Sequence, residues 1–200
     1  ANLLMFSLVV GGVLGLIEVR KEEFPNIDVP TITVTVPYLG AAPSEVETGV
    51  CIRIEEAVQG VEGIEKIKTI GDAYMCAGGV PVATPMTPVR AILTGLAMQQ
   101  LMNRINQEKV DENQPEWLLR IGIDTGPVIT GVVGKNKFAY DIWGDAVNLA
   151  ARMENSGEVG KVNISQQTYE LVKDKFTCTH RGKISAKNKG EVDMYFVEEN

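Results

Sequence analysis

A two-residue turn between two short apolar runs is the feature that most constrains the fold of this chain. Ile67-Lys68-Thr69-Ile70 has the composition of a strand, Gly71-Asp72 that of a tight turn, and Tyr74-Met75-Cys76-Ala77 that of a returning strand. So short a connection makes the two strands pair as an antiparallel hairpin. The hairpin presents a carboxylate at its tip and the Lys68 ammonium a few residues back, which suits a metal ion held near a nucleotide base.

Composition narrows the class of protein. Two hundred residues are enough for one large domain or two small ones with a real core. The net charge of -7 argues against a general nucleic-acid binder, whose affinity comes from Lys and Arg on phosphates. It leaves room for a small anionic substrate held by a few local lysines.

The cysteines predict no metal or disulfide framework. Cys51, Cys76 and Cys178 are scattered, and His180 is the single histidine of the sequence, so neither a zinc spacing nor paired cysteines can be recognised. We expect buried or inert thiols in a reducing compartment.

The first 17 residues carry no charge and are mostly apolar, and a cluster of charged residues at 18–23 ends the run. A membrane span needs roughly 17–25 such residues. No positive segment precedes the run and no small-residue cleavage site follows it, so the pattern favours a transmembrane helix over a cleaved signal peptide. A buried core helix or a signal remnant is the alternative.

A strand–helix–strand unit precedes the hairpin turn. Thr31–Val36 alternates strictly, as a half-buried strand does. Ser44 and Glu47 form a capping box at the start of an amphipathic helix that Gly60 ends. Ile64–Ile70 is the second strand.

The remaining elements are predicted from periodicity and from glycine and proline positions. In chain order they are a helix, two strands, a helix, a strand, a short helix and a closing strand pair: Val89–Gln107, Leu118–Ile123, Pro127–Val133, Asp145–Glu154, Lys161–Ser165, Gln166–Asp174, and Thr177–Ser185 with Val192–Val197. Gly134-Lys135-Asn136 is no P-loop, because it lacks the following Ser or Thr and the upstream Gly.

One predicted helix carries a polar stripe. Asp145, Asn148 and Arg152 recur at helical spacing and share one face. An acid, an amide and a guanidinium beside a core face suit a ribose and phosphate site, and a solvated polar face is the alternative. The residues expected nearer the core are Val147, Ala150 and Ala151.

Two stretches near the N-terminus resemble a known family. Glu22-Glu23-Phe24-Pro25-Asn26-Ile27-Asp28-Val29-Pro30 and Tyr38-Leu39-Gly40-Ala41-Ala42-Pro43-Ser44-Glu45-Val46-Glu47 look like the start of a resistance-nodulation-division efflux pump. In that family a first transmembrane helix leads into a strand–helix–strand porter unit. The resemblance covers about the first third of the chain, up to roughly Ile67, and carries no chemistry by itself.

A second and more specific resemblance covers the chain from Ile64 to the end. Lys68-Thr69-Ile70-Gly71-Asp72, then Arg120-Ile121-Gly122-Ile123-Asp124-Thr125-Gly126-Pro127-Val128, then the run from Tyr140 to Met153 resemble the class III nucleotidyl cyclases. The late Arg181-Gly182-Lys183-Ile184 and Lys187-Asn188-Lys189-Gly190 continue it. The implied fold is α+β, with a ferredoxin-like βαββαβ core.

Together the resemblances divide the chain into three parts. They are a transmembrane helix over residues 1–19, an efflux-pump-like strand–helix unit over 24–63 and a nucleotidyl cyclase domain over 64–200. The middle unit would stand in for the first strand and helices of the cyclase. The chain thus has the form of a chimera.

The cyclase resemblance implies a role for individual residues. Lys68 and Asp141 would read the base, and this pair points to ATP rather than GTP, because an ammonium and a carboxylate complement the ring nitrogen and amino group of adenine. Asp72 would be a ligand of Mg²⁺ or Mn²⁺.

Three further residues would contact the sugar and the phosphates. Asn148 would orient the ribose, Arg152 would stabilise charge developing on the transferring phosphoryl group, and Lys187 would hold the triphosphate.

The resemblance also implies a reaction and a quaternary structure. The ribose 3′-oxygen would attack the α-phosphorus to give 3′,5′-cyclic AMP and pyrophosphate, at sites shared between the two chains of a head-to-tail homodimer. With the predicted anchor, the protein would be membrane-attached with its cyclase domain in the cytoplasm; a purely cytoplasmic protein is the alternative.

The chain departs from the cyclase pattern at one position. The family places another metal-binding aspartate at the end of its first strand, whereas Pro37-Tyr38-Leu39-Gly40 follows the strand here, and the nearest acids, Glu45 and Glu47, belong to a helix start. Two-metal catalysis should therefore be weakened. A catalytically inactive dimerisation or nucleotide-binding module, or an efflux transporter fragment, are the rival functions.

Overall fold

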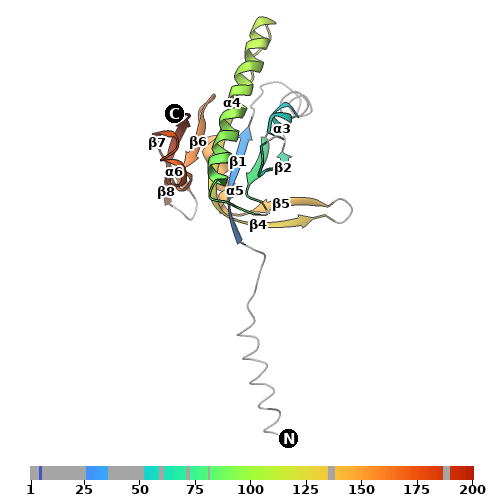
Figure 1. Cartoon of the computed structure of the whole chain (residues 1–200), viewed down its shortest axis with the longest axis vertical. Helices are drawn as coiled ribbons and strands as arrows, with labels where there is room; N and C mark the ends of the chain where they lie inside the picture. Colours follow the sequence, from blue (N-terminus) through green and yellow to red (C-terminus); the bar gives the residue numbers. More distant parts are fainter. Residues whose placement is uncertain are drawn as a thin grey trace.

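The computed structural model describes residues 5, 26–35, 52–58, 61–70, 73–80, 82–134, 138–186 and 190–200. These residues form one mixed α+β unit around an eight-stranded sheet, as the sequence predicts (Figure 1). The elements are β1 (Asn26–Thr35), α3 (Ile52–Val58), β2 (Ile64–Ile70), β3 (Ala73–Gly78), α4 (Thr87–Asp111), β4 (Arg120–Val133), β5 (Ala139–Trp143), α5 (Asp145–Asn155), β6 (Val162–Ser165), α6 (Gln166–Val172), β7 (Thr177–Ala186) and β8 (Gly190–Glu198).

The strand order of the sheet is β2-β3-β1-β4-β6-β8-β7, and β5 pairs with β4 outside this path. β2 and β3 form the predicted antiparallel hairpin. β4 and β6 are parallel. The closing pair β7 and β8 is antiparallel and covers the two predicted C-terminal strands.

β1 lies in the middle of the sheet. It pairs with β4 along its whole length and with β3 over Thr31–Thr35. It begins five residues before the predicted strand, so Pro30 lies inside it. The proline is tolerated because at this position β1 pairs with β4 alone, and its pairing with β3 starts at the next residue, Thr31. The segment that resembles a transporter thus supplies a central strand.

The prediction of separate strands at Leu118–Ile123 and Pro127–Val133 is wrong, because β4 is one continuous strand of 14 residues. A proline is tolerated in a strand where its missing N–H breaks no ladder. β6 pairs with β4 only at Ile121–Ile123, so among the described residues Pro127 has β1 as its neighbour on one side alone.

The predicted helices are present with adjusted ends. α4 begins two residues earlier than predicted, with Pro88 in its first turn, where the missing N–H costs nothing. Of the helix predicted after Ser44, the described part is α3, whose Ile54 and Val58 are buried. The capping residues Ser44 and Glu47 lie outside the described residues.

Helices cover both faces of the sheet. Ile121 and Ile123 on β4 belong to a buried cluster that includes Ile92 of α4. Gly122, between them, faces α5 instead: a Cβ atom there would lie 2.0 Å from the backbone nitrogen of Glu154 and 2.3 Å from the carbonyl oxygen of Ala150. Successive strand residues face opposite sides, so α4 and α5 pack on opposite faces.

Among the described residues no helix is long and apolar enough to cross a membrane. The transmembrane helix predicted for residues 1–19 lies outside that part of the chain, apart from Met5.

The contact at Gly122 gives a stability prediction. Gly122→Ala should lower the free energy of unfolding by at least about 3 kcal/mol, because the added methyl group meets backbone atoms that no rotamer change can move. Gly131→Ala on the same strand is the control, since its Cβ would meet only the Trp143 ring, at 3.3 Å. Urea unfolding measures both, and equal midpoints for the two variants would contradict the close helix–strand contact.

Candidate active site

An ion pair joins two strands that are not neighbours in the sheet order. The Lys68 ammonium of β2 donates to Asp141 Oδ2 of β5 at 2.8 Å. Both side chains are shielded, with 35% and 16% of their surface exposed. Asp141 Oδ1 also accepts the backbone N–H of Ile142 at 2.8 Å, so the carboxylate is held from two directions. The two residues predicted to read a base therefore lie together and pre-oriented.

A β-bulge in β2 gives Lys68 this direction. Lys66 pairs with Cys76 and Lys68 pairs with Met75, so Ile67 is the extra residue in the strand. Residues two apart in a regular strand share a face, but the bulge changes the phase. Lys66 consequently pairs with Glu55 of α3, while Lys68 turns to the opposite face and reaches Asp141.

The polar stripe of α5 is exposed as predicted. Asp145, Asn148 and Arg152 are exposed on this helix. Asn148 Nδ2 donates to the Gly144 carbonyl at 3.4 Å, and Arg152 Nη1 donates to the Ser185 carbonyl of β7 at 3.0 Å. The stripe therefore starts directly after the strand that carries Asp141 and ends beside Ser185 of β7.

The core side of α5 differs in part from the prediction. Ala150 is buried, but Val147 and Ala151 are half-buried. The other side chains that face the core are those of Ala146, Leu149, Met153 and Glu154. The physical reason is that α5 contacts the sheet at Gly122 through Ala150 and Glu154, so the residues on that side of the helix are the buried ones.

Gly144 joins β5 to α5 in a single residue. Its φ of 151° lies in the region that favours glycine, and a Cβ atom there would be 2.7 Å from the Pro127 carbonyl oxygen. This tight connection is what brings Asp141 and Asn148 onto adjoining elements.

Two predicted site residues, Asp72 and Lys187, lie outside the described residues. Asp72 precedes Ala73, the first residue of β3, and Lys187 follows Ala186, the last residue of β7. Lys187 is thus two residues after Ser185, whose carbonyl Arg152 contacts.

The residues at the hairpin end of β1 do not fit a two-metal site. Thr35, at the end of β1, pairs with Ala73, and the strand supplies Thr and Val there instead of an acid. In the described part of the chain no cluster of three His, Cys, Asp or Glu side chains could hold a metal ion. Glu45 and Glu47, the nearest other acids, lie outside that part. In the sequence, Asp72 directly precedes Ala73, the β3 partner of Thr35.

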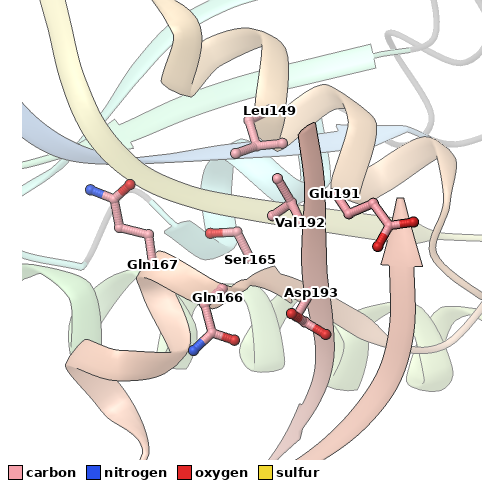
Figure 2. Close-up of a pocket in the computed structure, with 7 residues that line it drawn as sticks. All are labelled: Leu149, Ser165, Gln166, Gln167, Glu191, Val192 and Asp193. Carbon is pink, nitrogen blue, oxygen red and sulfur yellow. The ribbon is translucent and has the colours of Figure 1, made fainter. Parts of the chain in front are cut away.

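A cavity of about 420 Å³ lies beside α5 but does not suit a triphosphate (Figure 2). Glu191 and Asp193 on β8 contribute its charged groups, and none of the described residues that line it is a Lys or an Arg. Asp193 pairs with His180 at 2.7 Å. The other lining residues are Leu149, Ser165, Gln166, Gln167 and Val192.

The sequence did not single out a buried ion pair beneath α5. Arg120 Nε donates to Glu154 Oε1 at 2.9 Å, and only 3% of the Glu154 side chain is exposed. Helical spacing could have revealed it, because Glu154 follows Ala150 by four residues and shares its buried face.

Burial makes one thiol inert, as predicted. Cys76 is fully buried, and desolvation raises the pKa of its thiol to about 12. Burial also raises the pKa of the half-buried Cys178. Cys51 lies outside the described residues. Neither described thiol is poised as a nucleophile or a metal ligand.

The mixed sheet and the Lys68–Asp141 pair agree with the nucleotidyl cyclase class that the sequence indicates. The family model described as the adenylate and guanylate cyclase catalytic domain matches residues 51–199, and the chain belongs to this family. A model of the AcrB/AcrD/AcrF family matches residues 1–74. Both resemblances seen in the sequence are thereby confirmed, with residues 51–74 common to the two matches.

Curated relatives include cyclases for both purine nucleotides. An adenylate cyclase of Mycobacterium tuberculosis is 40% identical over 135 residues, which are 68% of this chain and 30% of the relative. The guanylate cyclase soluble subunit beta-2 of Rattus norvegicus is 39% identical over 145 residues, which are 70% of this chain and 20% of the relative. The chain thus spans less than a third of these proteins, and family membership leaves the base open.

Solved structures share the fold. The adenylyl cyclase CyaB from P. aeruginosa has a TM-score of 0.79 at 26% identity, over 88% of this chain and 96% of that chain. The catalytic core of a rhodopsin-guanylyl cyclase with converted specificity, in complex with ATPalphaS, has a TM-score of 0.78 at 26% identity, over 90% and 100% of the two chains.

The raised pKa of Cys76 gives a chemical prediction. At pH 9 the folded protein should leave Cys76 unmodified by iodoacetamide, because a thiol with a pKa of about 12 is almost entirely protonated there and is sealed in the core. Cys178, which is half-buried, should react first. Peptide mass mapping reads both, and urea-unfolded protein is the control in which Cys76 reacts. Equal labelling of the two cysteines in the folded protein would contradict the burial.

Proposed function

We propose that this chain is an adenylyl cyclase-type domain that converts ATP into 3′,5′-cyclic AMP and pyrophosphate. The observation that carries the proposal is the Lys68–Asp141 pair at 2.8 Å. The reaction is attack of the ribose 3′-oxygen on the α-phosphorus. The proposal treats the sheet as built on a ferredoxin-like βαββαβ core of the class III type.

The pair suits the hydrogen-bonding edge of adenine. An ammonium has three donors, and one N–H of Lys68 is used by Asp141, so others remain for the ring nitrogen. Each carboxylate oxygen keeps a lone pair for the amino group. Guanine presents a carbonyl oxygen and a ring N–H in the reverse order and would meet like groups. A site that leaves buried polar groups unpaired rejects the wrong base.

The α5 stripe continues the site toward the phosphates. Asn148 lies in the first turn of α5, after the strand that carries Asp141, and orients the ribose, while Arg152 stabilises charge that develops on the phosphoryl group. Lys187, two residues after the Ser185 carbonyl that Arg152 contacts, holds the triphosphate. In this proposal β5 contacts the base, the start of α5 contacts the ribose, and the end of α5 contacts the phosphates.

Asp72 is the one ligand that we assign to Mg²⁺ or Mn²⁺. A single carboxylate does not make a two-metal site, so no step of the reaction is derived through a metal pair. This deficit supports a second candidate function, a nucleotide-binding module that binds ATP without turnover.

An apolar arm supports a homodimer. The β4–β5 arm, residues 129–133 and 138–143, extends away from the rest of the sheet (Figure 1). Val132 exposes 64% and Phe138 exposes 78% of its surface. The other exposed apolar residues of the arm are Ile129, Val133, Tyr140 and Trp143. Such patches mark interaction sites, and we assign this one to a second copy of the chain that completes the site.

The membrane anchor over residues 1–19, with the cyclase domain in the cytoplasm, stays a prediction from the sequence. So does the division into units at 24–63 and 64–200.

The substrate assignment predicts a base preference. With Mn²⁺ the protein should form cyclic AMP from ATP faster than cyclic GMP from GTP. Lys68→Met and Asp141→Asn should each lower kcat/KM for ATP about tenfold to hundredfold, because each leaves the other group of the pair without its partner. Lys66→Met is the matched control, since Lys66 pairs with Glu55 on the opposite face.

The outcomes separate the candidates. A preference for GTP would overturn the adenine assignment, and ATP binding measured by calorimetry without any cyclic product would establish the inactive module instead. Activity that survives Asp72→Ala would exclude the metal role of that residue.

The dimer assignment predicts a change in oligomeric state. Phe138→Asp and Val132→Asp should each weaken dimerisation at least about thirtyfold, because a charge then enters an apolar interface. Val82→Asp is the control, since Val82 exposes 73% of its surface away from the arm. Sedimentation velocity over a concentration series measures all three. A dimer unaffected by both arm variants would place the interface elsewhere.

A further inference from the structure

The last turn of α5 is fastened to the sheet at several points, and Arg152 lies in this turn. The contacts come from Arg120 and Gly122 of β4 and from Asn163 of β6. We refer to these three residues as the α5 anchor. Each touches the helix within two residues of Arg152.

The first anchor contact is charged and shielded. Arg120 Nε donates to Glu154 Oε1 at 2.9 Å, with 27% of the Arg120 side chain and 3% of the Glu154 side chain exposed. A carboxylate this deeply buried needs its partner, because the unpaired charge would be strongly destabilised. The pair therefore fixes the rotation of α5 about its axis.

The second contact holds the helix backbone. Asn163 is fully buried, and its Nδ2 donates to the Met153 carbonyl at 2.7 Å. Carbonyls in the last turn of a helix have no partner within the helix. Asn163 supplies a hydrogen-bond donor from the sheet to the Met153 carbonyl. This bond sets the height of the helical turn above β6.

The third contact is steric. At Gly122 the backbones of β4 and α5 touch, so α5 has no room to move closer to the sheet. Rotation, height and distance of the turn are thus all set from the sheet side.

Arg152 projects from the opposite side of the same turn. It is exposed, and its Nη1 donates to the Ser185 carbonyl on β7 at 3.0 Å. Its neighbours Met153 and Glu154 are both held by the anchor. A shift of the turn would move the guanidinium away from Ser185 and from a phosphate bound by its remaining N–H groups.

We propose that Arg120 and Asn163 are positioning residues for Arg152: they hold the guanidinium at the place where it meets the nucleotide phosphates. The inference rests on the proposed role of Arg152 and extends it to two residues that do not touch substrate. A purely structural role for Arg120 and Asn163 is the alternative.

The experiment measures how much the triphosphate adds to binding, so it needs no turnover. Dissociation constants for ATP and for adenosine are determined by calorimetry with Mn²⁺ on the full chain, and their ratio is compared among variants. Arg152→Ala, Arg120→Met and Asn163→Leu should each reduce the advantage of ATP over adenosine by about tenfold, with adenosine affinity unchanged. Arg90→Met is the matched control, because it breaks an Arg–Glu pair with Glu62 that touches no part of α5.

A double-mutant comparison separates positioning from a structural role. In the Arg152→Ala background, Arg120→Met should cause no further loss of the ATP advantage, because residues that act through one group are non-additive. A further loss, or an unchanged ratio in both Arg120→Met and Asn163→Leu, would overturn the inference.

Two controls keep the result decisive. If Arg120→Met fails to fold, Arg120→Lys keeps the charge without the Nε donor and should still lose part of the ATP advantage. If Arg152→Ala leaves the ratio unchanged, the proposed role of Arg152 fails and the positioning role fails with it. A loss in Arg152→Ala alone rejects only the positioning role.

Discussion

The pairing of β1 with β3 on one side and β4 on the other is the constraint on which the sheet depends. Without β1, the β2–β3 hairpin would have no strand to join it to β4, β6, β8 and β7. The hairpin carries Lys68, and β4 leads to the strand that carries Asp141, so the ion pair of the candidate site exists only because β1 sets these elements at a fixed spacing. That β1 comes from the segment matched by a transporter family shows how little a central strand needs beyond alternation and backbone pairing.

Much of this architecture could be predicted because it depends on local patterns. The hairpin followed from Gly71-Asp72 and its apolar flanks, and the exposed stripe of Asn148 and Arg152 followed from helical spacing. The continuity of β4 could not be predicted, because whether a proline ends a strand depends on which neighbours that strand has. The Arg120–Glu154 pair was missed since it joins residues 34 positions apart. The roles proposed for the site residues came from the family resemblance, because local patterns do not specify which ligand a side chain binds.

In the candidate site, the side chains proposed to bind the nucleotide are held by contacts with the fold, whereas the carboxylates proposed to bind metal ions are few. Lys68 and Asp141 are partly shielded and paired, and Arg152 is supported from beneath by buried contacts. The carboxylates that would gather metal ions are reduced to Asp72 in the sequence. Recognition of a nucleotide and its chemical conversion place different demands on a domain, and the groups proposed for recognition are more complete in this chain than those proposed for metal-assisted conversion.

The bulge at Ile67 has a consequence for how β2 tolerates changes in length. The register of Lys68, Thr69 and Ile70 is set by the hairpin turn, whereas that of Ile64 is set by the core it enters. Ile67, the extra residue of the bulge, lies between these two parts of β2, and neither part fixes its register. A residue gained or lost on the α3 side of Ile67 can be taken up at the bulge, with the alignment of Lys68 on Met75 unaltered. The bulge thus separates the register of Lys68 from insertions and deletions upstream, and it lies within residues 51–74, which both family models match.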